Sequence, residues 1–588
     1  MANRKGGLPG TAAWIPNCRK FIPLVIVLAA LAGYWNSFGG AFVFDDTSSI
    51  RDNPNIRQLW PLWQAATSAP NIAVAGRPTV SLSLAINYAF WGLNTWGYHA
   101  LNLAIHVLLA LLLFGIVRRT ISVEHHWNTC ERQAPWLAGA TALIWAVHPL
   151  TTESVTYIIQ RTESLMGLFF LLTLYSVIRG ASSHRPHKWW MTAFASCALG
   201  MGSKEVMVVA PPLVLLYDRI FLSRSFRDIF RARWVLYLCL AATWILLGGL
   251  LLAGPRSATA GLRVGGLTPT EYLLTQFGVI PHYLRLCIWP YPLCIDYFDW
   301  PITRTFAGAL PQITLIAGLI AGAILWFQTQ PWLSFLIAWF FLILAPTSSV
   351  LPIVTELVAE RRMYLPLMAV VLLVVLLGQA LISKFPQGKI TPAISFVLLF
   401  GIAVALGSMT ARRNEAYRSE VAILSDAVNQ RPKNIRARNN LGSALAREGR
   451  IDEAIDQFNQ VLATFPKYPE ALNNLGAALY TKGRYKAAAA LMSDAVRLKP
   501  DYAEAHLNLG LALHSQGELK EAIVHYTEAL RLSPGEAEAH NHLGVALLSL
   551  HQAQEAIAHF QEALLLRPDY QEARKNLENA LSQDTPPQ

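Results

Sequence analysis

The chain is poor in charged residues and in cysteine. Only 14% of its 588 residues are charged and its mean hydropathy is +0.34, whereas a soluble globular protein carries roughly 25% charged residues. This composition excludes an ordinary soluble enzyme. The six cysteines are too few for a disulfide scaffold and lack the spacing of a zinc site. Only Cys287 and Cys294 lie close together in a predicted loop, where an oxidising compartment would permit a disulfide.

Long apolar runs fill the first 410 residues. The first extends from Phe21 to about Gly39 and is longer than the apolar core of a cleaved signal peptide, so we interpret it as a membrane helix. The small residues from Leu28 to Gly33 leave cleavage open as the alternative. About eleven membrane helices are predicted, several shorter than the roughly 20 residues that a hydrocarbon core requires. The further runs lie near 98–117, 135–149, 162–178, 189–202, 205–217, 234–253, 305–326, 332–350, 363–383 and 390–409.

Basic residues mark one side of this predicted membrane domain. If the loops alternate from the inside, the inner loops hold 17 bases against four acids, Glu124, Glu131, Asp218 and Asp228. Cytoplasmic loops carry such an excess, so residues 1–20 are predicted to be cytoplasmic. The net charge of +11 is then mostly a matter of topology, and no nucleic-acid partner is expected. The inner bases are Arg4, Lys5, Arg19, Lys20, Arg118, Arg119, Arg132, Arg179, Arg185, Lys188, Arg219, Arg224, Arg227, Arg231, Arg233, Lys384 and Lys389.

Adjacent acids follow the first apolar run. Asp45 and Asp46 lie in the segment FVFDDTSSIRDNPNIR, residues 42–57. Acids beside an apolar phase cost free energy, which favours a functional use over a polar loop that merely contains acids. An odd number of spans places the other unexplained polar residues on the same, extracytoplasmic face. These residues lie in the loop 150–161, the corner 203–205, the long loop 254–304 and the loop 351–362.

A period of 34 residues begins near residue 435. Small residues and prolines recur at this spacing, as is typical of tetratricopeptide repeats, in which paired helices pack closely. We predict a linker or helix at 411–434, four repeats at 435–570, and a capping helix and tail at 571–588. The recurring positions are Gly442, Gly476, Gly510 and Gly544; Ala454, Ala488, Ala522 and Ala556; and Pro466, Pro500, Pro534 and Pro568.

Asparagines recur on the first helix of each repeat, which lines the concave face of such a solenoid. Their amides can hydrogen-bond the backbone of an extended peptide, so they are candidate ligands of an acceptor polypeptide. A solvated polar face is an equal alternative. The arrangement resembles the superhelix of O-GlcNAc transferase, where asparagines hold acceptor polypeptide. The residues concerned are Asn439, Asn440, Asn473, Asn474, Asn508 and Asn541.

Several loop motifs resemble the TMTC family, the transmembrane and tetratricopeptide-repeat containing proteins, which belong with the protein O-mannosyltransferase-like glycosyltransferases of the GT-C fold. The resemblance implies an all-α chain in which a polytopic GT-C-type domain, residues 21–410, precedes the repeats. The matching stretches are FVFDDTSSIRDNP (42–54), GRPTVSLSLAINYAFWGLNTWGYHALNLAIHVL (76–108), HPLTTESVTYIIQRTESL (148–165), SKE (203–205), PHYLRLCIWPYPLCIDY (281–297) and AERRMYLP (359–366).

The resemblance also implies an activity. A sugar, mannose by family analogy, would pass from a polyprenyl-phosphate donor to serine or threonine of a protein acceptor on the extracytoplasmic face. The family's catalytic acidic pair corresponds to Asp45 and Asp46, and a carboxylate that accepts the hydroxyl proton aids attack. A metal held by these carboxylates could instead bind the phosphate. Because the protein mannosyltransferases that this chain resembles use none, no metal or other cofactor is expected.

The departing lipid phosphate requires cations. Arg361 and Arg362, beside Glu360, are the first candidates because guanidinium binds phosphate in a bidentate manner. Several candidates have a structural alternative: interfacial anchoring for Arg361 and Arg362, an ion pair with Glu205 for Lys204, a hydrated loop for Arg161 and a helix cap for His148. The aromatic segment 286–300 suits either a stretch that grips the donor lipid or an ordinary aromatic belt. The further candidates are Arg285, His282, Lys204, Arg161 and His148.

Three classes of function remain at this point. The chain is a lipid-linked-sugar glycosyltransferase, a catalytically inactive membrane-anchored repeat scaffold, or a transporter. A bare anchor needs neither the acid pair nor the bases, and an inverted-repeat pattern of broken helices is not evident. A glycosyltransferase is therefore favoured, with its repeats outside the cytoplasm. The short loops favour a bacterial inner membrane with a periplasmic repeat domain; in a eukaryote the compartment would be the endoplasmic reticulum lumen.

Overall fold

The structure, a computed structural model, describes residues 19–68, 72–123, 133–253, 266–349, 352–384 and 390–584. Helices account for the regular structure in these ranges, which contain no strand, and the all-α prediction is confirmed. The chain divides into two compact units, Met1–Arg431 and Pro432–Gln588. The predicted inner-loop residues that lie outside the described ranges are Arg4, Lys5, Glu124, Glu131, Arg132 and Lys389.

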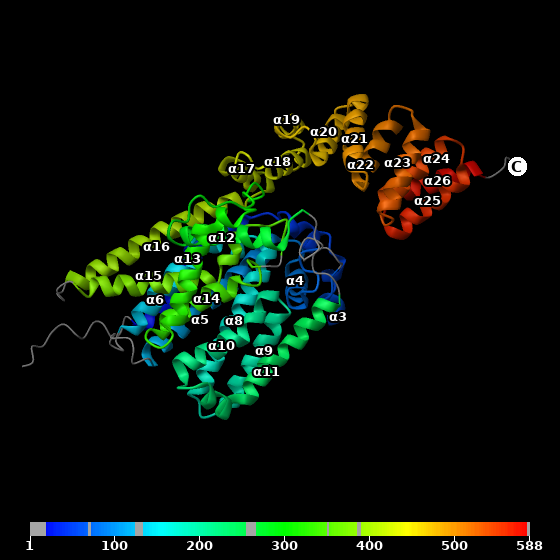
Figure 1. Ribbon diagram of the computed structural model, residues 1–588. Helices are drawn as coiled ribbons and strands as arrows, with labels where there is room; N and C mark the ends of the chain where they lie inside the picture. The colour runs from blue at the N-terminus through cyan, green and yellow to red at the C-terminus, as the bar shows by residue number, and fades with distance from the viewer. Residues whose placement is uncertain are drawn as a thin grey trace, which may run out of the picture. The chain divides into compact units, whose positions relative to one another are not determined.

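The first unit is a bundle of apolar helices (Figure 1). Within the described residues, six segments are long and apolar enough to cross a membrane: Arg19–Gly39, Thr95–Ser122, Ile158–Ala181, Phe226–Leu252, Phe306–Leu325 and Ile394–Ala416. Shorter apolar helices include Ala134–Ala146, Pro331–Leu344 and Pro366–Ile382. The prediction of a domain built from several apolar, membrane-spanning helices is thus confirmed, while the count of about eleven spans stays a prediction.

The principal helices of this unit are α2 (Ile22–Tyr34), α3 (Leu62–Ala66), α4 (Pro78–Trp91), α5 (Thr95–Val123), α6 (Ala134–Ala146), α7 (Thr152–Thr156), α8 (Arg161–Ala181), α9 (Pro186–Met201), α10 (Ala210–Tyr217), α11 (Phe226–Leu252), α12 (Pro269–Ile288), α13 (Phe306–Leu325), α14 (Pro331–Leu344), α15 (Pro366–Ile382), α16 (Ile390–Ala416) and α17 (Glu420–Gln430).

Helices α5 and α8 run in the same direction and define two ends of the bundle. Near their starts, Arg161 Nε donates to Asn102 Oδ1 at 2.6 Å. Near their ends, the Arg119 guanidinium lies over the Tyr175 ring, 5.1 Å from its centroid. The loop of Asp45 and Asp46 contacts the first of these ends, through Ile159. We call it the acid-pair end and refer to the other as the opposite end.

Helix α12 corrects the prediction that 254–304 is one long loop. Pro269 occupies its first turn, and Thr268 and Glu271 form a capping box, which together start a stable helix. One face is buried: the Tyr272 hydroxyl donates to the Thr347 carbonyl at 2.7 Å, and the Tyr283 hydroxyl donates to the Ala359 carbonyl at 3.0 Å. The helix thereby holds the segment before α15. Its mixture of apolar and polar residues lacks the continuous apolar run by which the membrane helices were predicted.

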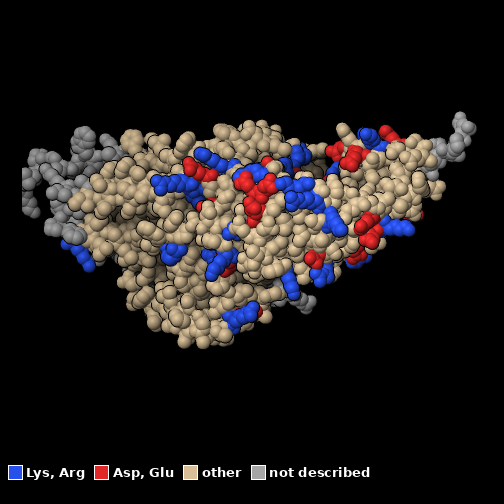
Figure 2. Space-filling view, turned by 90° about the horizontal axis from the view of Figure 1, so that it is seen from above, with Lys and Arg blue, Asp and Glu red and all other residues tan. Residues whose placement is uncertain are grey.

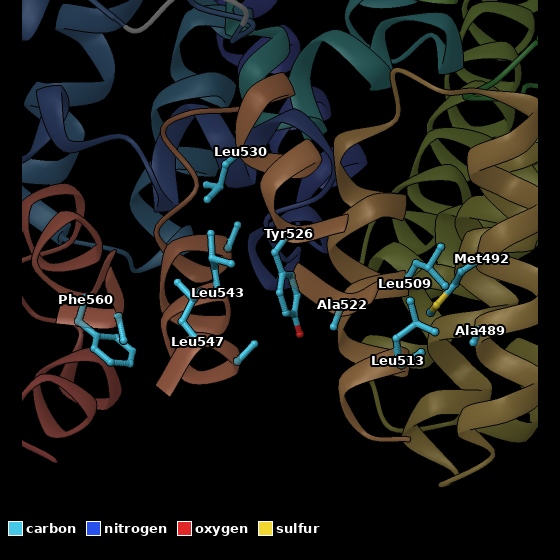
Figure 3. Close-up of a cluster of buried hydrophobic side chains, with 14 of the residues drawn as sticks. Ala489, Met492, Leu509, Leu513, Ala522, Tyr526, Leu530, Leu543, Leu547 and Phe560 are labelled. Atoms are coloured by element: carbon cyan, nitrogen blue, oxygen red, sulfur yellow. The ribbon is translucent and has the colours of Figure 1, made fainter. Parts of the chain in front are cut away.

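The second unit is a helical solenoid, as the period of 34 residues predicts. The repeated glycines are required by close packing, because a Cβ at Gly442 would lie 2.5 Å from the Phe458 ring and one at Gly510 would lie 2.6 Å from Tyr526. Figure 3 shows the core between successive helices, with Tyr526 and Phe560 among its buried side chains. The helices are α18 (Ile435–Arg447), α19 (Ile451–Thr464), α20 (Pro469–Thr481), α21 (Tyr485–Leu498), α22 (Ala503–His514), α23 (Leu519–Leu532), α24 (Ala537–Ser549), α25 (Ala553–Leu566) and the terminal α26 (Gln571–Asp584).

Candidate active site

The two acids have different environments. Asp46 is fully buried, and both of its carboxylate oxygens accept backbone N–H groups: Oδ2 from Val43 at 3.1 Å and Oδ1 from Ile159 at 2.8 Å. The carboxylate therefore ties its own loop to the segment 148–161. Burial raises the pKa of Asp46 to about 8, although the two N–H donors favour the charged form.

Asp45 is exposed, in contrast to its neighbour. Its backbone N–H donates to the Tyr157 hydroxyl at 3.1 Å, and Phe44 before it has a φ of +48°, an uncommon conformation for a residue other than glycine. The surrounding protein reduces the hydration of the Asp45 carboxylate, which raises its pKa, and the negative charge of Glu356 raises the pKa further. The positive charge of Arg361 lowers it. The backbone is thus fixed on both sides of a carboxylate that remains open to solvent.

Arg361 connects two carboxylates at the acid-pair end. Its Nη1 donates to Glu153 at 2.6 Å, its backbone N–H donates to the other oxygen of Glu153 at 3.0 Å, and its Nη2 donates to Glu356. Partial burial opposes the charge on Glu356, but Arg361 and Arg362 hold the pKa of Glu356 down to about 2. Only 11% of the Arg361 side chain is exposed, so it is a buried network residue and not an interfacial anchor.

The neighbours of Arg361 hold the backbone. Arg362 donates to the carbonyls of Glu356 at 2.6 Å and Leu357 at 3.3 Å, which closes the segment before α15 on itself. Glu360 is buried and accepts from the Cys294 N–H at 2.6 Å and from the Tyr297 hydroxyl. Burial raises the pKa of Glu360 to about 7. Glu360 thereby fixes the predicted aromatic segment 286–300.

Three further candidates also have protein partners. Arg161 is fully buried and donates to Asn102 and to the Tyr98 carbonyl at 3.0 Å. Lys204 pairs with Glu163, where the sequence suggested Glu205 as the alternative partner. His148 caps a helical turn: its Nδ1 accepts the Leu150 N–H at 3.2 Å, and its Nε2 donates to the Cys287 carbonyl at 3.1 Å.

The candidates on α12 lie at the surface of the aromatic segment. Arg285 is exposed and donates to the Tyr291 carbonyl at 3.0 Å. The His282 ring contacts the rings of Tyr297 and Trp300, with centroid distances of 5.6 and 4.9 Å. Cys287 and Cys294, the pair for which a disulfide was considered, are free and buried.

Arg77 is a cation that the candidate set omitted. It precedes α4, and its charge acts on Asp45. Its Nε is buried without a hydrogen-bond partner among the described residues, and its nearest carboxylate contact, to Glu205, is 3.5 Å long. Arg77 is therefore less committed to protein partners than Arg361. A sequence signal existed, since Arg77 stands beside Pro78 at a predicted extracytoplasmic loop, inside a stretch that carried the family resemblance.

Metal ligands do not converge at this site. In the described ranges, no group of three or more histidine, cysteine, aspartate or glutamate side chains is placed to hold a metal ion. The cations next to Asp45 are arginines instead. On the face drawn in Figure 2, charged side chains gather in groups that broad uncharged areas separate. Independence of metal stays a prediction that activity measurements must test.

The predicted asparagine row in the repeats mainly bonds to itself. Asn474 donates to Asn439 Oδ1 at 3.1 Å, and Asn508 donates to Asn473 Oδ1 at 3.0 Å. Asn473 is fully buried. These amides join successive first helices, α18 to α20 and α20 to α22. Asn440 is half-buried, and no hydrogen bond of its amide is found among the described residues, so it stays a candidate acceptor ligand.

One link in this row is replaced. Asn576 on the terminal helix donates to the fully buried Asn541 at 2.9 Å, which repeats the same spacing of 35 residues. Between α22 and α24, however, the corresponding positions hold Leu507 and His542. The His542 ring stacks on Tyr526 at a centroid distance of 6.1 Å. A ring stack thus takes the place of an amide hydrogen bond at this joint.

Comparison with known proteins agrees with both halves of this description. The sequence profile of dolichyl-phosphate-mannose-protein mannosyltransferases matches residues 77–248. Tetratricopeptide repeat profiles match residues 412–469, 439–503, 473–537 and 513–577. This chain carries a domain of that mannosyltransferase family, followed by tetratricopeptide repeats. The mannosyltransferase match begins at Arg77 and does not include the acid pair.

Several curated relatives carry the name protein O-mannosyl-transferase. Protein O-mannosyl-transferase Tmtc3 of Drosophila melanogaster is 26% identical over 75% of this chain and 54% of its own length. F38B6.6 of Caenorhabditis elegans is 26% identical over 76% and 63%, and human TMTC4 is 25% identical over 74% and 65%. The chain therefore spans between about half and two thirds of these relatives. Among solved structures, a crystal structure of MamA is 25% identical over 26% of this chain and 90% of its own, with a TM-score of 0.24.

Proposed function

We propose that the chain is a membrane glycosyltransferase that moves mannose from a polyprenyl-phosphate donor to serine or threonine of a protein acceptor. The observation that carries the proposal is the environment of Asp45. Its carboxylate is exposed on a fixed backbone, and the charges of Arg77 and Arg361 act on it. The mannosyltransferase domain and the names of the relatives support the sugar and the acceptor class.

Asp45 is the proposed general base. Its carboxylate accepts the proton of the acceptor hydroxyl while the hydroxyl oxygen forms a bond to the anomeric carbon. The bond from that carbon to the phosphate oxygen breaks, and the electron pair leaves with the lipid phosphate. Attack opposite the leaving group inverts the configuration at the anomeric carbon. Arg77 is the proposed phosphate ligand because its Nε has no partner among the described residues.

Asp46 is proposed to fix the position of Asp45 and to leave the negative charge of Asp45 unopposed. Its two accepted N–H bonds set the path of the backbone that presents Asp45. Because burial raises the pKa of Asp46 to about 8, it is largely protonated at neutral pH. A neutral neighbour does not oppose the negative charge that Asp45 needs as a base.

The repeats are proposed to present the acceptor. The amides of Asn440, Asn474 and Asn508 are half-buried, so part of each is open to a bound chain. The excess of bases in the predicted inner loops supports a cytoplasmic N-terminus, and the predicted odd number of spans would then place the repeats on the other face. Because the chain spans only part of each relative, the names of the relatives support the proposed substrates but do not establish them.

The decisive experiment is a transfer assay with purified full-length protein. The donors are radiolabelled polyprenyl-phosphate mannose and glucose, and the acceptor is a pool of serine and threonine peptides. Asp45→Asn is expected to lower the rate by about 10²-fold or more, because general base catalysis typically contributes 10²–10⁴-fold. Asp52→Asn is the matched control, since Asp52 is an exposed acid of the same loop that pairs with Arg51. Transfer by wild type that Asp45→Asn leaves intact contradicts the assignment of the base.

Two further arms of this assay separate the remaining parts of the proposal. Arg77→Gln is expected to raise KM for the lipid donor more than KM for the peptide, because it removes a phosphate ligand. A chelator is expected to leave the rate unchanged. Absence of transfer by the wild type with either donor would instead favour a membrane-anchored scaffold, in which the repeats are the functional part.

A further inference from the structure

The opposite end of the bundle contains a recess lined by arginines. It has a volume of about 530 Å³ and lies between the end of α5 and the turn from α8 to α9. We call it the arginine recess. Its lining residues are Arg119, Arg179, Ser182, Ser183, His184 and Arg185.

The recess is far from the candidate active site. Arg161 marks the start of α8 and Arg179 its last turn; at 1.5 Å per residue, their Cα atoms are about 27 Å apart along the axis. A hydrocarbon core is roughly 30 Å thick. The acid-pair end and the recess therefore lie near opposite faces of the membrane. The charge distribution predicts the recess to be on the cytoplasmic side.

The arginines of the recess have no acidic partners among the described residues. Arg179 lies over the Trp189 ring at 4.7 Å, and its closest polar contact, with the Tyr175 hydroxyl, is 3.4 Å long. Arg119 lies over Tyr175, and its contact with the Gly115 carbonyl is 3.5 Å. The aromatic rings hold the planar faces of these guanidiniums, which leaves N–H groups at the edges for a ligand.

Another arginine near this end shows what a purely structural cation looks like in this fold. Arg233 donates to both oxygens of Asp218, at 2.6 and 2.8 Å, and to Ser223. The same carboxylate accepts from Tyr237. Arg233 thus has an acid of its own, whereas the described lining of the arginine recess consists of three arginines, two serines and a histidine, with no acid. Topology alone requires positive charge in these loops, but it does not require the charges to converge on one cavity.

We propose that the arginine recess binds the phosphodiester headgroup of an anionic phospholipid of the adjacent leaflet. The edges of Arg119 and Arg179 offer bidentate donors to phosphate oxygens, and Ser182 and Ser183 add hydroxyls of the kind that hydrogen-bond phosphate or a glycerol headgroup. Basic pockets between membrane helices on the cytoplasmic side favour such headgroups. Binding at this position would brace the ends of α5 and α8 without involving the candidate active site.

The test compares full-length protein in phosphatidylcholine nanodiscs with and without phosphatidylglycerol. Native mass spectrometry of the released protein measures which lipid is retained. The wild type is expected to prefer phosphatidylglycerol by at least about tenfold, a difference of about 1.4 kcal/mol. Arg119→Gln/Arg179→Gln/Arg185→Gln is expected to lose this preference. A wild type without preference, or a triple variant that keeps it, overturns the proposal.

A matched triple variant controls for charge. Arg224→Gln/Arg227→Gln/Arg231→Gln removes three exposed bases of the predicted same side that do not line the recess, and it is expected to keep the preference. If both triple variants lose the preference for phosphatidylglycerol equally, the lipid is attracted by the overall positive charge of this side. That result would overturn the proposal of a specific site. Arg185→Gln alone removes a side chain with no ion pair among the described residues, so it tests the site without risk to folding. Displacement of the bound lipid by inorganic phosphate alone would show that the recess binds a soluble anion, and it would overturn the proposal of a lipid ligand.

Discussion

The acid-pair end of the first unit and the asparagine row of the second use polar side chains in opposite ways. At the acid-pair end, the buried Asp46 carboxylate holds the loop that exposes Asp45, and Arg361 joins Glu153 to Glu356 beside it. In the repeats, Asn473 and Asn541 are buried in bonds to other asparagines. The first region uses structural bonds to present Asp45, the proposed general base, and the second uses them to join helices.

This difference shows that a repeated polar residue and a reactive one have separate signatures in three dimensions. A residue that holds structure has its donors and acceptors matched inside the protein, because an unmatched buried group costs free energy. A residue that meets a substrate keeps part of its bonding capacity unused. By this criterion, Asp45, Arg77 and Asn440 keep bonding capacity unused among the described residues, whereas Asn474 and Asn508 already donate to other asparagines.

The largest effect expected on stability comes from breaking the arginine network. Arg361→Gln leaves Glu153 and Glu356 without their cation and is expected to cost about 3–5 kcal/mol of unfolding free energy. Thermal unfolding in detergent measures it. Arg285→Gln is the control, because Arg285 is exposed and its one hydrogen bond reaches a carbonyl at the surface. Equal melting temperatures for the two variants would contradict the structural role of Arg361.

A smaller effect is expected from the charge state of Asp46. Its pKa is raised to about 8 in the folded protein, so the folded state holds a proton that the unfolded state releases above the ordinary pKa. Stability is then greatest at low pH and falls as the pH rises through 8, by about 2–3 kcal/mol between pH 6 and pH 9. Asp46→Asn is expected to remove this part of the pH dependence. Parallel pH profiles of melting temperature for both proteins would contradict the raised pKa.

The smallest effect concerns the asparagine row. Asn473→Ala leaves partners in α20 and α22 unmatched and is expected to cost about 1–3 kcal/mol. Hydrogen–deuterium exchange of these two helices in the full-length chain measures it. Asn440→Ala is expected to change the free energy of local opening of these helices by less than about 0.5 kcal/mol. It is expected to weaken peptide binding instead. If Asn440→Ala loosens the helices as much as Asn473→Ala, the distinction between joining and binding asparagines is wrong.

The sequence predicted periodic features well. The all-α class, the membrane helices and the repeats follow from apolar runs and from a strict spacing, which depend on local physics. Helix α12 was missed because its single buried face breaks the apolar run. The ranking of the candidate cations placed Arg361 and Arg362 first and omitted Arg77, because residue type alone does not show which arginines have protein partners. Only the fold shows that Arg161 donates to Asn102 and Tyr98 while Arg77 keeps its Nε unpaired among the described residues.

The replaced link in the asparagine row has a mechanical consequence. Amide hydrogen bonds are directional, so the joints from α18 to α20, from α20 to α22 and from α24 to α26 resist rotation. The ring stack of His542 on Tyr526 tolerates sliding. We therefore expect the superhelix to change its pitch most easily between α22 and α24, so that a long polypeptide lying along the solenoid would meet a stiff first section followed by a compliant joint.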